Sequence, residues 1–145
     1  MSTVNQNIIA KLLTNFGNIS IANGYSFDIN GHVYEWRETP PVDAELPLIN
    51  IKDPAHRFVD SDENPNENEL DIEIDFIAAP GDDSPADVRD KKQDIMNAFK
   101  LIENESYITG AQYIDSELLV DHDKRKYAGS TMRFKIWYAT DRWIL

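Results

Sequence analysis

The sequence contains no cysteine among its 145 residues, which excludes a disulfide framework, a thiolate nucleophile and a cysteine zinc site. It also has no run of 18 apolar residues, about the length that a membrane-spanning helix needs. Basic residues are scarce: 14 Lys plus Arg stand against 26 Asp plus Glu, a formal net charge of −12. Because a phosphate backbone would meet a field of its own sign, nucleic-acid binding by bulk electrostatics is disfavoured. We expect an acidic protein of a reducing compartment that does not engage a membrane.

Catalytic and cofactor motifs are missing as well. The sequence has no Gly-rich phosphate loop, no Gly-x-Ser-x-Gly elbow and no His-Glu-x-x-His. Its histidines, His32, His56 and His122, stand far apart. A calcium loop beginning at Asp60 fails because Pro65 stands where the sharp turn needs glycine, although weak cation binding by its carboxylates stays open. We therefore expect no enzyme activity, no cofactor and no dedicated metal site.

The length of the chain favours one domain over residues 1–145, without internal repeats or linkers. Surface scaling predicts that about two-thirds of the unfolded surface becomes buried, which is enough for a core without covalent staples.

Two segments show the three-and-four spacing of apolar residues that is typical of an amphipathic helix. The first covers residues 4–16, with Ser2 or Thr3 as its cap and Gly17 at its end. The second begins at Ser84 and Pro85 and runs to about residue 102. Its buried face should hold Val88, Ile95, Phe99 and Ile102, with Lys91 and Lys92 pointing outward.

The segments between the helices favour β-strands. Asn30-Gly31 predicts a two-residue hairpin turn that pairs residues 25–29 with residues 32–36. Residues 46–52 predict a short buried strand that Asp53-Pro54 closes, and residues 70–77 alternate as a half-buried strand does. The inward positions of that strand are Leu70, Ile72, Ile74 and Phe76.

Residues 113–120 and 131–139 are the last two predicted strands. The order of helix, about four strands, helix and two strands predicts an α+β fold. We expect a mostly antiparallel mixed sheet with both helices packed on one face.

An acidic run separates the predicted strands. Residues 60–69 contain no apolar side chain, so they predict a mobile acidic loop. Between Asp60 and Asp75 there are eight acidic residues and no basic one. This run is either an electrostatic surface, for a basic partner or against a polyanion, or a solvated face. In addition, Arg133 and Lys135 could lie beside Asp71, Glu73 and Asp75 if those strands are neighbours.

The segment 140–145 ends in three bulky apolar residues. Burying each would contribute roughly 1.5 to 3 kcal/mol, so we expect them to return to the core or to dock on another subunit. Trp137, on a charged strand face, favours an interface in the same way. The candidate contact residues are Asp60, Asp62, Glu63, Glu67, Glu69, Trp137, Trp143, Ile144 and Leu145.

The order of these elements resembles the tail terminator and minor tail proteins of long-tailed bacteriophages. The resemblance covers nearly the whole chain and rests on element order and turn residues. Its pieces are the early helix leading into Asn23-Gly24-Tyr25, Asp28-Ile29, the entry Glu45-Leu46-Pro47 to a strand finished by Asp53, the acidic strand from Leu70, the helix with Asp94-Ile95, and the final Phe134, Ile136 and Tyr138.

The resemblance implies a virion structural protein at the head-proximal end of the tail, present in the host cytoplasm during assembly. Such proteins form a hexameric ring that caps the tail tube, stops its polymerisation and provides the head-joining surface. The implied partners are further copies of the chain, the tail tube protein and a head-completion or neck protein. DNA would pass through the lumen without specific binding, and the ring would need a head-to-tail interface.

Other functions stay open. The chain could be another phage neck or head-tail connector protein. A small hydrolase could use the carboxylate pair Asp115 and Glu117, or Asp121 and Asp123, if an apolar pocket raised the pKa of one member. An acidic binder of a basic host protein is the third alternative.

Overall fold

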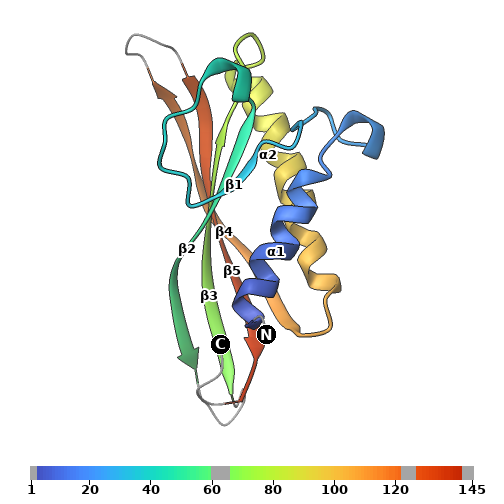
Figure 1. Ribbon diagram of the computed structural model, residues 1–145, viewed down its shortest axis with the longest axis vertical. Coiled ribbons are helices and arrows are strands. Elements are labelled where there is room, and N and C mark those ends of the chain that lie inside the picture. The colour runs from blue at the N-terminus through green and yellow to red at the C-terminus, as the bar shows by residue number, and fades with distance from the viewer. Residues whose placement is uncertain (1–2, 60–65, 122–126, 142–145) are drawn as a thin grey trace.

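The computed structural model describes residues 3–59, 66–121 and 127–141, with only the backbone of Val120 and Asp121. In these residues two α-helices accompany one five-stranded sheet (Figure 1). The helices are α1 (Val4–Gly17) and α2 (Pro85–Lys100). The strands are β1 (Val33–Glu35), β2 (Leu48–Val59), β3 (Glu67–Ile77), β4 (Ile108–Asp121) and β5 (Tyr127–Ala139).

The sheet has the strand order β1-β2-β3-β5-β4. β1 runs parallel to β2, and the other three neighbouring pairs are antiparallel. Both helices lie on the same face of the sheet (Figure 1). The predicted α+β class, with a mostly antiparallel mixed sheet under two helices, is confirmed.

Each helix begins at the cap that its sequence predicts. Thr3 accepts a hydrogen bond from the backbone N–H of Gln6, and Ser84 accepts one from Asp87, so each cap satisfies a backbone donor of the first turn. After Lys100 the second helix continues as a short 3₁₀ turn, Leu101–Asn104, which carries the buried Ile102. No helix in the described part of the chain is long and apolar enough to span a membrane.

The core lies between the helices and the facing side of the sheet. The predicted inward positions of β3 and of α2 are all buried there. A one-residue slip of β3 would turn four large apolar side chains to water, so burial fixes its register. The apolar core residues contributed by these two elements are Leu70, Ile72, Ile74, Phe76, Val88, Ile95, Ala98 and Phe99.

The predicted hairpin at residues 25–36 is wrong, although its turn forms. Asn30 and Gly31 have φ values of 55° and 75°, and the N–H of His32 donates to the carbonyl of Ile29 over 3.0 Å. The arms of the turn do not pair, because Phe27 and Ile29 are buried in the core and the second arm joins β2 in parallel as β1. Three strands therefore precede α2 in the described chain, not about four.

The prediction that Asp53-Pro54 closes the second strand is also wrong. β2 continues to Val59, and its register against β3 shifts between Lys52 and Ala55. A bulge absorbs the proline, which has no N–H to give to a ladder. The indole Nε1 of Trp36 donates to Asp53 Oδ1 at 2.6 Å beside this bulge.

The prediction that residues 60–69 form a loop is wrong for its last three residues. Residues 67–69 belong to β3, where Glu67 lies opposite Val59 and Ala139. Residues 60–65 lie outside the described residues. Pairing on both sides satisfies the backbone of these three residues despite their polar side chains.

The outward direction predicted for two lysines of α2 is wrong. Lys91 is buried; its Nζ lies 3.4 Å from the carbonyl oxygen of Asp82 and 5.8 Å from the ring centroid of Phe27. Lys92 is half-buried and donates to Ser116 Oγ at 2.6 Å. Long lysine stems can cover apolar surface while their ammonium groups find polar partners, so helical spacing alone does not place them.

Candidate functional site

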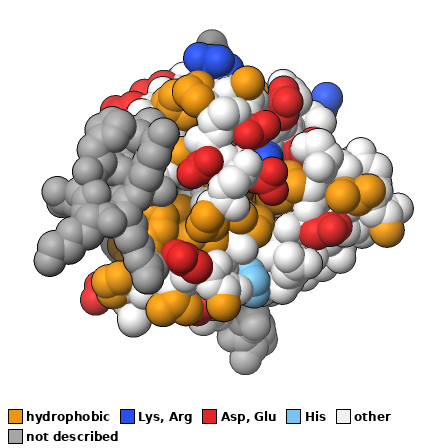
Figure 2. Space-filling view, turned by 90° about the horizontal axis from the view of Figure 1, so that it is seen from above, with side chains coloured by type: hydrophobic (Ala, Val, Ile, Leu, Met, Phe, Trp, Pro, Cys, Tyr) orange, Lys and Arg blue, Asp and Glu red, His pale blue; other side chains and the backbone are white. Residues whose placement is uncertain are grey.

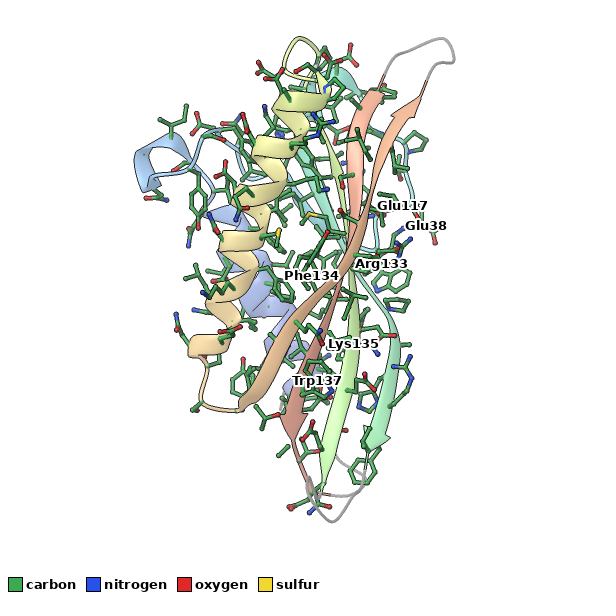
Figure 3. All side chains as sticks on the ribbon, turned by 180° about the vertical axis from the view of Figure 1, so that it is seen from behind. Glu38, Glu117, Arg133, Phe134, Lys135 and Trp137 are labelled. Atoms are coloured by element: carbon green, nitrogen blue, oxygen red, sulfur yellow. The ribbon has the colours of Figure 1, made fainter. Side chains whose placement is uncertain are left out.

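The sheet face opposite the helices, here called the outer face, carries charge in rows that alternate from strand to strand. Alternate residues of a strand share a face, which aligns each row. Figure 3 shows Phe134 pointing toward α2 while its neighbours Arg133 and Lys135 point to the other side. The rows are Lys52 and Arg57 on β2, Glu69, Asp71, Glu73 and Asp75 on β3, Arg133 and Lys135 on β5, and Asp115 and Glu117 on β4.

The acidic row of β3 is paired on both sides. Lys135 Nζ lies 2.6 Å from Glu69 Oε1, and Lys52 Nζ lies 2.9 Å from Asp75 Oδ2. Arg57 donates twice to Asp71, at 2.9 and 3.2 Å, and this contact lowers the pKa of the Asp71 carboxyl. The predicted placement of Arg133 and Lys135 beside the β3 carboxylates is confirmed.

The acidic row of β4 is only partly compensated. Arg133 Nη1 lies 2.9 Å from Asp115 Oδ1 and 3.6 Å from Glu117 Oε1, while its Nε lies 3.7 Å from Glu73. The guanidinium of Arg133 thus contacts three carboxylates. These contacts raise the pKa of Arg133, chiefly through the hydrogen bond to Asp115. The side chains of Asp115 and Glu117 are 57% and 62% exposed. β4 therefore presents an excess of negative charge along the edge of the sheet that it forms.

Both edges of the sheet are open within the described chain. β4 forms one edge, and no described strand pairs with its far side. At the other edge β1 covers only Ile49, Asn50 and Ile51 of β2. Residues 55–59 thus have no described strand on the side that faces away from β3, and we call this side the free β2 edge. Three antiparallel strand pairings connect β2 to β4 across the sheet. The strands at the two edges, β2 and β4, therefore run in opposite directions.

Large apolar side chains are exposed along both edges. Phe58 and Val59 project from the free β2 edge. A long exposed edge with apolar side chains is a template for pairing with another chain. The exposed apolar residues of β4 are Tyr113, Ile114, Leu118 and Leu119.

A groove of about 310 Å³ lies between α2 and β4 on the helix side of the sheet. The ring of Phe99 stacks on Phe134 with centroids 3.9 Å apart, and Tyr113 meets Phe134 edge to face at 5.6 Å. Met96 completes this apolar floor, while Gln93 and Lys100 stand at its polar rim. The groove thus continues the exposed edge of β4 with an aromatic surface.

Of the predicted contact residues, Glu67, Glu69 and Trp137 belong to the described part of the chain, where they lie on neighbouring positions of β3 and β5. Glu67 and Glu69 lie in β3, and Glu69 is paired with Lys135. Trp137 is half-buried on the outer face opposite Glu69, next to Gly110 of β4, where a Cβ would come within 3.5 Å of its ring. The remaining predictions lie outside the described residues, namely Asp60, Asp62, Glu63, Trp143, Ile144 and Leu145.

Sequence reasoning missed the residues of the free β2 edge, and it did not identify β4 as an edge strand. Arg57, Phe58 and Val59 form a basic and apolar end of β2, in a stretch that we predicted to follow the strand. The signal was present, because Phe58-Val59 is an apolar pair directly before a segment without apolar residues. Which strands become edges depends on strand order, which sequence pattern does not determine.

The residues considered for chemistry have other partners. Asp115 and Glu117 are exposed on the outer face, where both contact Arg133. Asp123 and the side chain of Asp121 lie outside the described residues. Nε2 of His56 lies 2.9 Å from Oδ1 of Asn68. In the part of the chain that the structure describes, no three His, Asp or Glu side chains form a group that could hold a metal ion.

The acidic character extends to the end of the molecule where α2 begins. Viewed from that end in Figure 2, carboxylates are spread among apolar side chains, and basic side chains are few. The sequence matches no known protein-family model and none of the curated proteins with which it was compared. Its function must therefore be inferred from the sheet, its open edges and its charge rows.

Proposed function

We propose that this protein is a tail terminator of a long-tailed bacteriophage. In this role it is a virion structural protein without catalysis. Copies of the chain assemble as a ring, hexameric by the family resemblance, on the last ring of the tail tube. The ring stops polymerisation of the tube and provides the surface to which a head-completion or neck protein joins.

The observation that carries this proposal is the pair of open, oppositely directed sheet edges. A copy rotated about an axis along the strands presents its β2 edge antiparallel to β4 of its neighbour. All copies then point the same way, and the contact joins two different surfaces. Repetition of such a head-to-tail contact closes into a ring when the rotation divides a full turn.

The charge of the outer face suits the lumen of such a ring. Since both helices occupy the other face, the outer face is the one free to line a channel. Its rows contain six carboxylates and four basic side chains, in addition to the acidic balance of the whole chain. An excess of negative charge keeps DNA from adhering to the wall while it passes.

Native mass measurement and electron microscopy over a range of protein concentrations test this function. We expect closed rings of one size, or caps at the ends of tubes assembled from a tail tube protein of the same phage. Monomers at every concentration, together with no binding to tube ends, would contradict the proposal.

Another ring of the neck or head-tail connector is the second candidate, because the same open edges support it. The two candidates differ in the surface they bind. A terminator protects tube ends from further growth, whereas a connector binds the head without affecting tube growth. Measuring tube length with and without the protein separates them, since only a terminator shortens and fixes the tubes.

A further inference from the structure

We infer that the free β2 edge of one copy pairs with β4 of a second copy of this chain in one antiparallel register. In this register Arg57 lies opposite Asp115 and Phe58 lies opposite Tyr113. The inference rests on the proposed ring and deepens it, because it names the two surfaces that meet and the residues that align them.

The first argument is the alternation of charge. From β2 to β4 the rows of the outer face are basic, acidic, basic and acidic. Placing the basic β2 row of a second copy beside β4 continues the alternation without a break. Opposite charges that face one another across neighbouring strands attract, and like charges repel.

The second argument is the bridging pattern that Arg133 already shows within one copy. Its guanidinium contacts Glu73 on β3 and Asp115 on β4. Arg57 binds Asp71 on β3 in the same way, but its other side faces the open edge, and its side chain is 49% exposed. A second copy would bring Asp115 to that side, and Arg57 would bridge two strands as Arg133 does.

The third argument is the direction of the side chains. Arg57 lies opposite Glu69 and Asp115 lies opposite Arg133, so both are on the outer face. Phe58 lies opposite the buried Asn68, and Tyr113 lies opposite the buried Phe134, so both are on the helix side.

The bulge of β4 makes these two pairings compatible. The register of β4 against β5 shifts between Tyr113 and Asp115, which leaves Ile114 as the extra residue. If Arg57 lies opposite Asp115, the next pair beyond the bulge is therefore Phe58 with Tyr113. Each of these two rings is 38% exposed in the single chain. The same register thus satisfies the charged pair and covers two aromatic side chains.

The groove between α2 and β4 supports the aromatic contact. Tyr113 forms one wall of this groove of about 310 Å³, and Phe99 and Phe134 form its floor. Phe58 of the second copy would enter beside Tyr113 and extend the aromatic cluster. Buried aromatic side chains commonly dominate the binding energy of an interface.

Symmetric pairing of like edges is disfavoured by the same charges. A two-fold axis between two β4 strands would bring the carboxylates of Asp115 and Glu117 toward their own copies. A two-fold axis between two free β2 edges would do the same for Arg57. The charges therefore select the head-to-tail contact, which leads to a ring, over a closed dimer.

Disulfide trapping tests the register, and the lack of native cysteine makes the result unambiguous. The inferred register places Ala55 opposite Glu117, both on the outer face, so the variant A55C/E117C should cross-link into ladders that end at one closed size. The matched control A55C/L119C moves the second cysteine two residues along the same face and should cross-link at least tenfold more slowly. Equal cross-linking of both variants would overturn the register.

A charge swap tests the partner surfaces. D115K and R57E alone should each assemble at least tenfold more weakly than the unmodified chain, because each places like charges at the contact. Their mixture should recover assembly with the two variants in equal numbers, since Lys meets Glu at one contact and Arg meets Asp at the next. Circular dichroism of each variant verifies that the fold persists.

The outcomes separate this inference from the proposed function. If the unmodified chain forms rings but the swap has no effect and both cysteine variants react alike, the register is wrong and the ring stands. If the unmodified chain neither forms rings nor caps tubes, the proposed function falls, and this inference falls with it.

Discussion

Gly129 is a position where the packing of two strands leaves no room for a side chain. It lies on β5 opposite Ile77, and a Cβ added there would overlap the carbonyl oxygen of Phe76 and lie 3.2 Å from Cα of Ile77. Backbone atoms of a central strand cannot move aside as a flexible side chain does. The restriction therefore concerns space and not backbone conformation.

Replacing Gly129 by Ala should destabilise the fold by about 1 to 3 kcal/mol, as overpacking of a well-packed core commonly does. Urea denaturation measures this change. The control is Gly17→Ala at the end of α1, where a Cβ meets nothing within 4 Å and stability should change by less than about 0.5 kcal/mol. Equal effects of the two variants would contradict this account of Gly129.

The ion pair of Arg37 with Glu45 makes stability depend on pH. Both nitrogens of the Arg37 fork donate to Glu45, at 2.6 and 2.8 Å, and this contact lowers the pKa of the Glu45 carboxyl to about 2. A carboxyl whose pKa is depressed in the folded state stabilises it above its unfolded pKa, near 4.5, and loses that contribution as pH falls toward 2.

Glu45→Gln should therefore be less stable than the unmodified chain at neutral pH, and the difference should shrink as pH falls from about 4.5 to 2. Denaturation curves of both proteins at several pH values measure it. Glu103→Gln, at an exposed position outside this contact, serves as the matched control. A difference that stays constant with pH would show that the lost contact is not electrostatic.

At the scale of elements, the sequence pattern correctly predicted the helices and strands that bury a single face. The start of α2 at Ser84 and the inward row of β3 are confirmed, because capping residues and strict alternation act locally. Residues 25–36 were not predictable in this way. The Asn30-Gly31 turn is correct, but the choice between pairing its arms and burying Phe27 depends on the distant Phe76.

The candidate site was predictable to a similar extent. The pairing of Arg133 and Lys135 with β3 carboxylates follows from opposite charge on neighbouring strands, and it is confirmed. The open edges follow from strand order, in which β5 lies between β3 and β4. A long-range arrangement of this kind leaves no periodic trace in the sequence.

Double-mutant cycles test the placement of Phe27. The rings of Phe27 and Phe76 meet edge to face at 5.7 Å, so removing both should show a coupling free energy of about 0.5 to 1.5 kcal/mol. Tyr34, the partner of Phe27 in the discarded hairpin, should show no coupling with it beyond about 0.5 kcal/mol. Urea denaturation of the single and double Ala variants supplies both cycles. If Phe27 were coupled to Tyr34 and not to Phe76, the result would support the predicted hairpin against the observed packing.

At the scale of the whole molecule, stability and assembly should depend on different residues. The core that holds the fold lies between the helices and the sheet, whereas the surfaces that we propose to meet are at its edges. A change at an edge that alters no buried contact should therefore weaken assembly and leave the single chain intact. Ile114 is suited to this test because it is exposed at the bulge of β4.

Ile114→Lys should change the free energy of unfolding by less than about 0.5 kcal/mol, since surface substitutions commonly stay within that range. It should reduce ring formation at least tenfold, because its ammonium group would face Arg57 of the next copy and because lysine at an edge opposes strand pairing. The matched control is Ile21→Lys in the 3₁₀ turn Ile21–Asn23, an exposed site that projects beyond the helices (Figure 1). That variant should assemble as the unmodified chain does. Native mass measurement compares the three proteins, and equal assembly of all three would show that β4 is not part of the contact between copies.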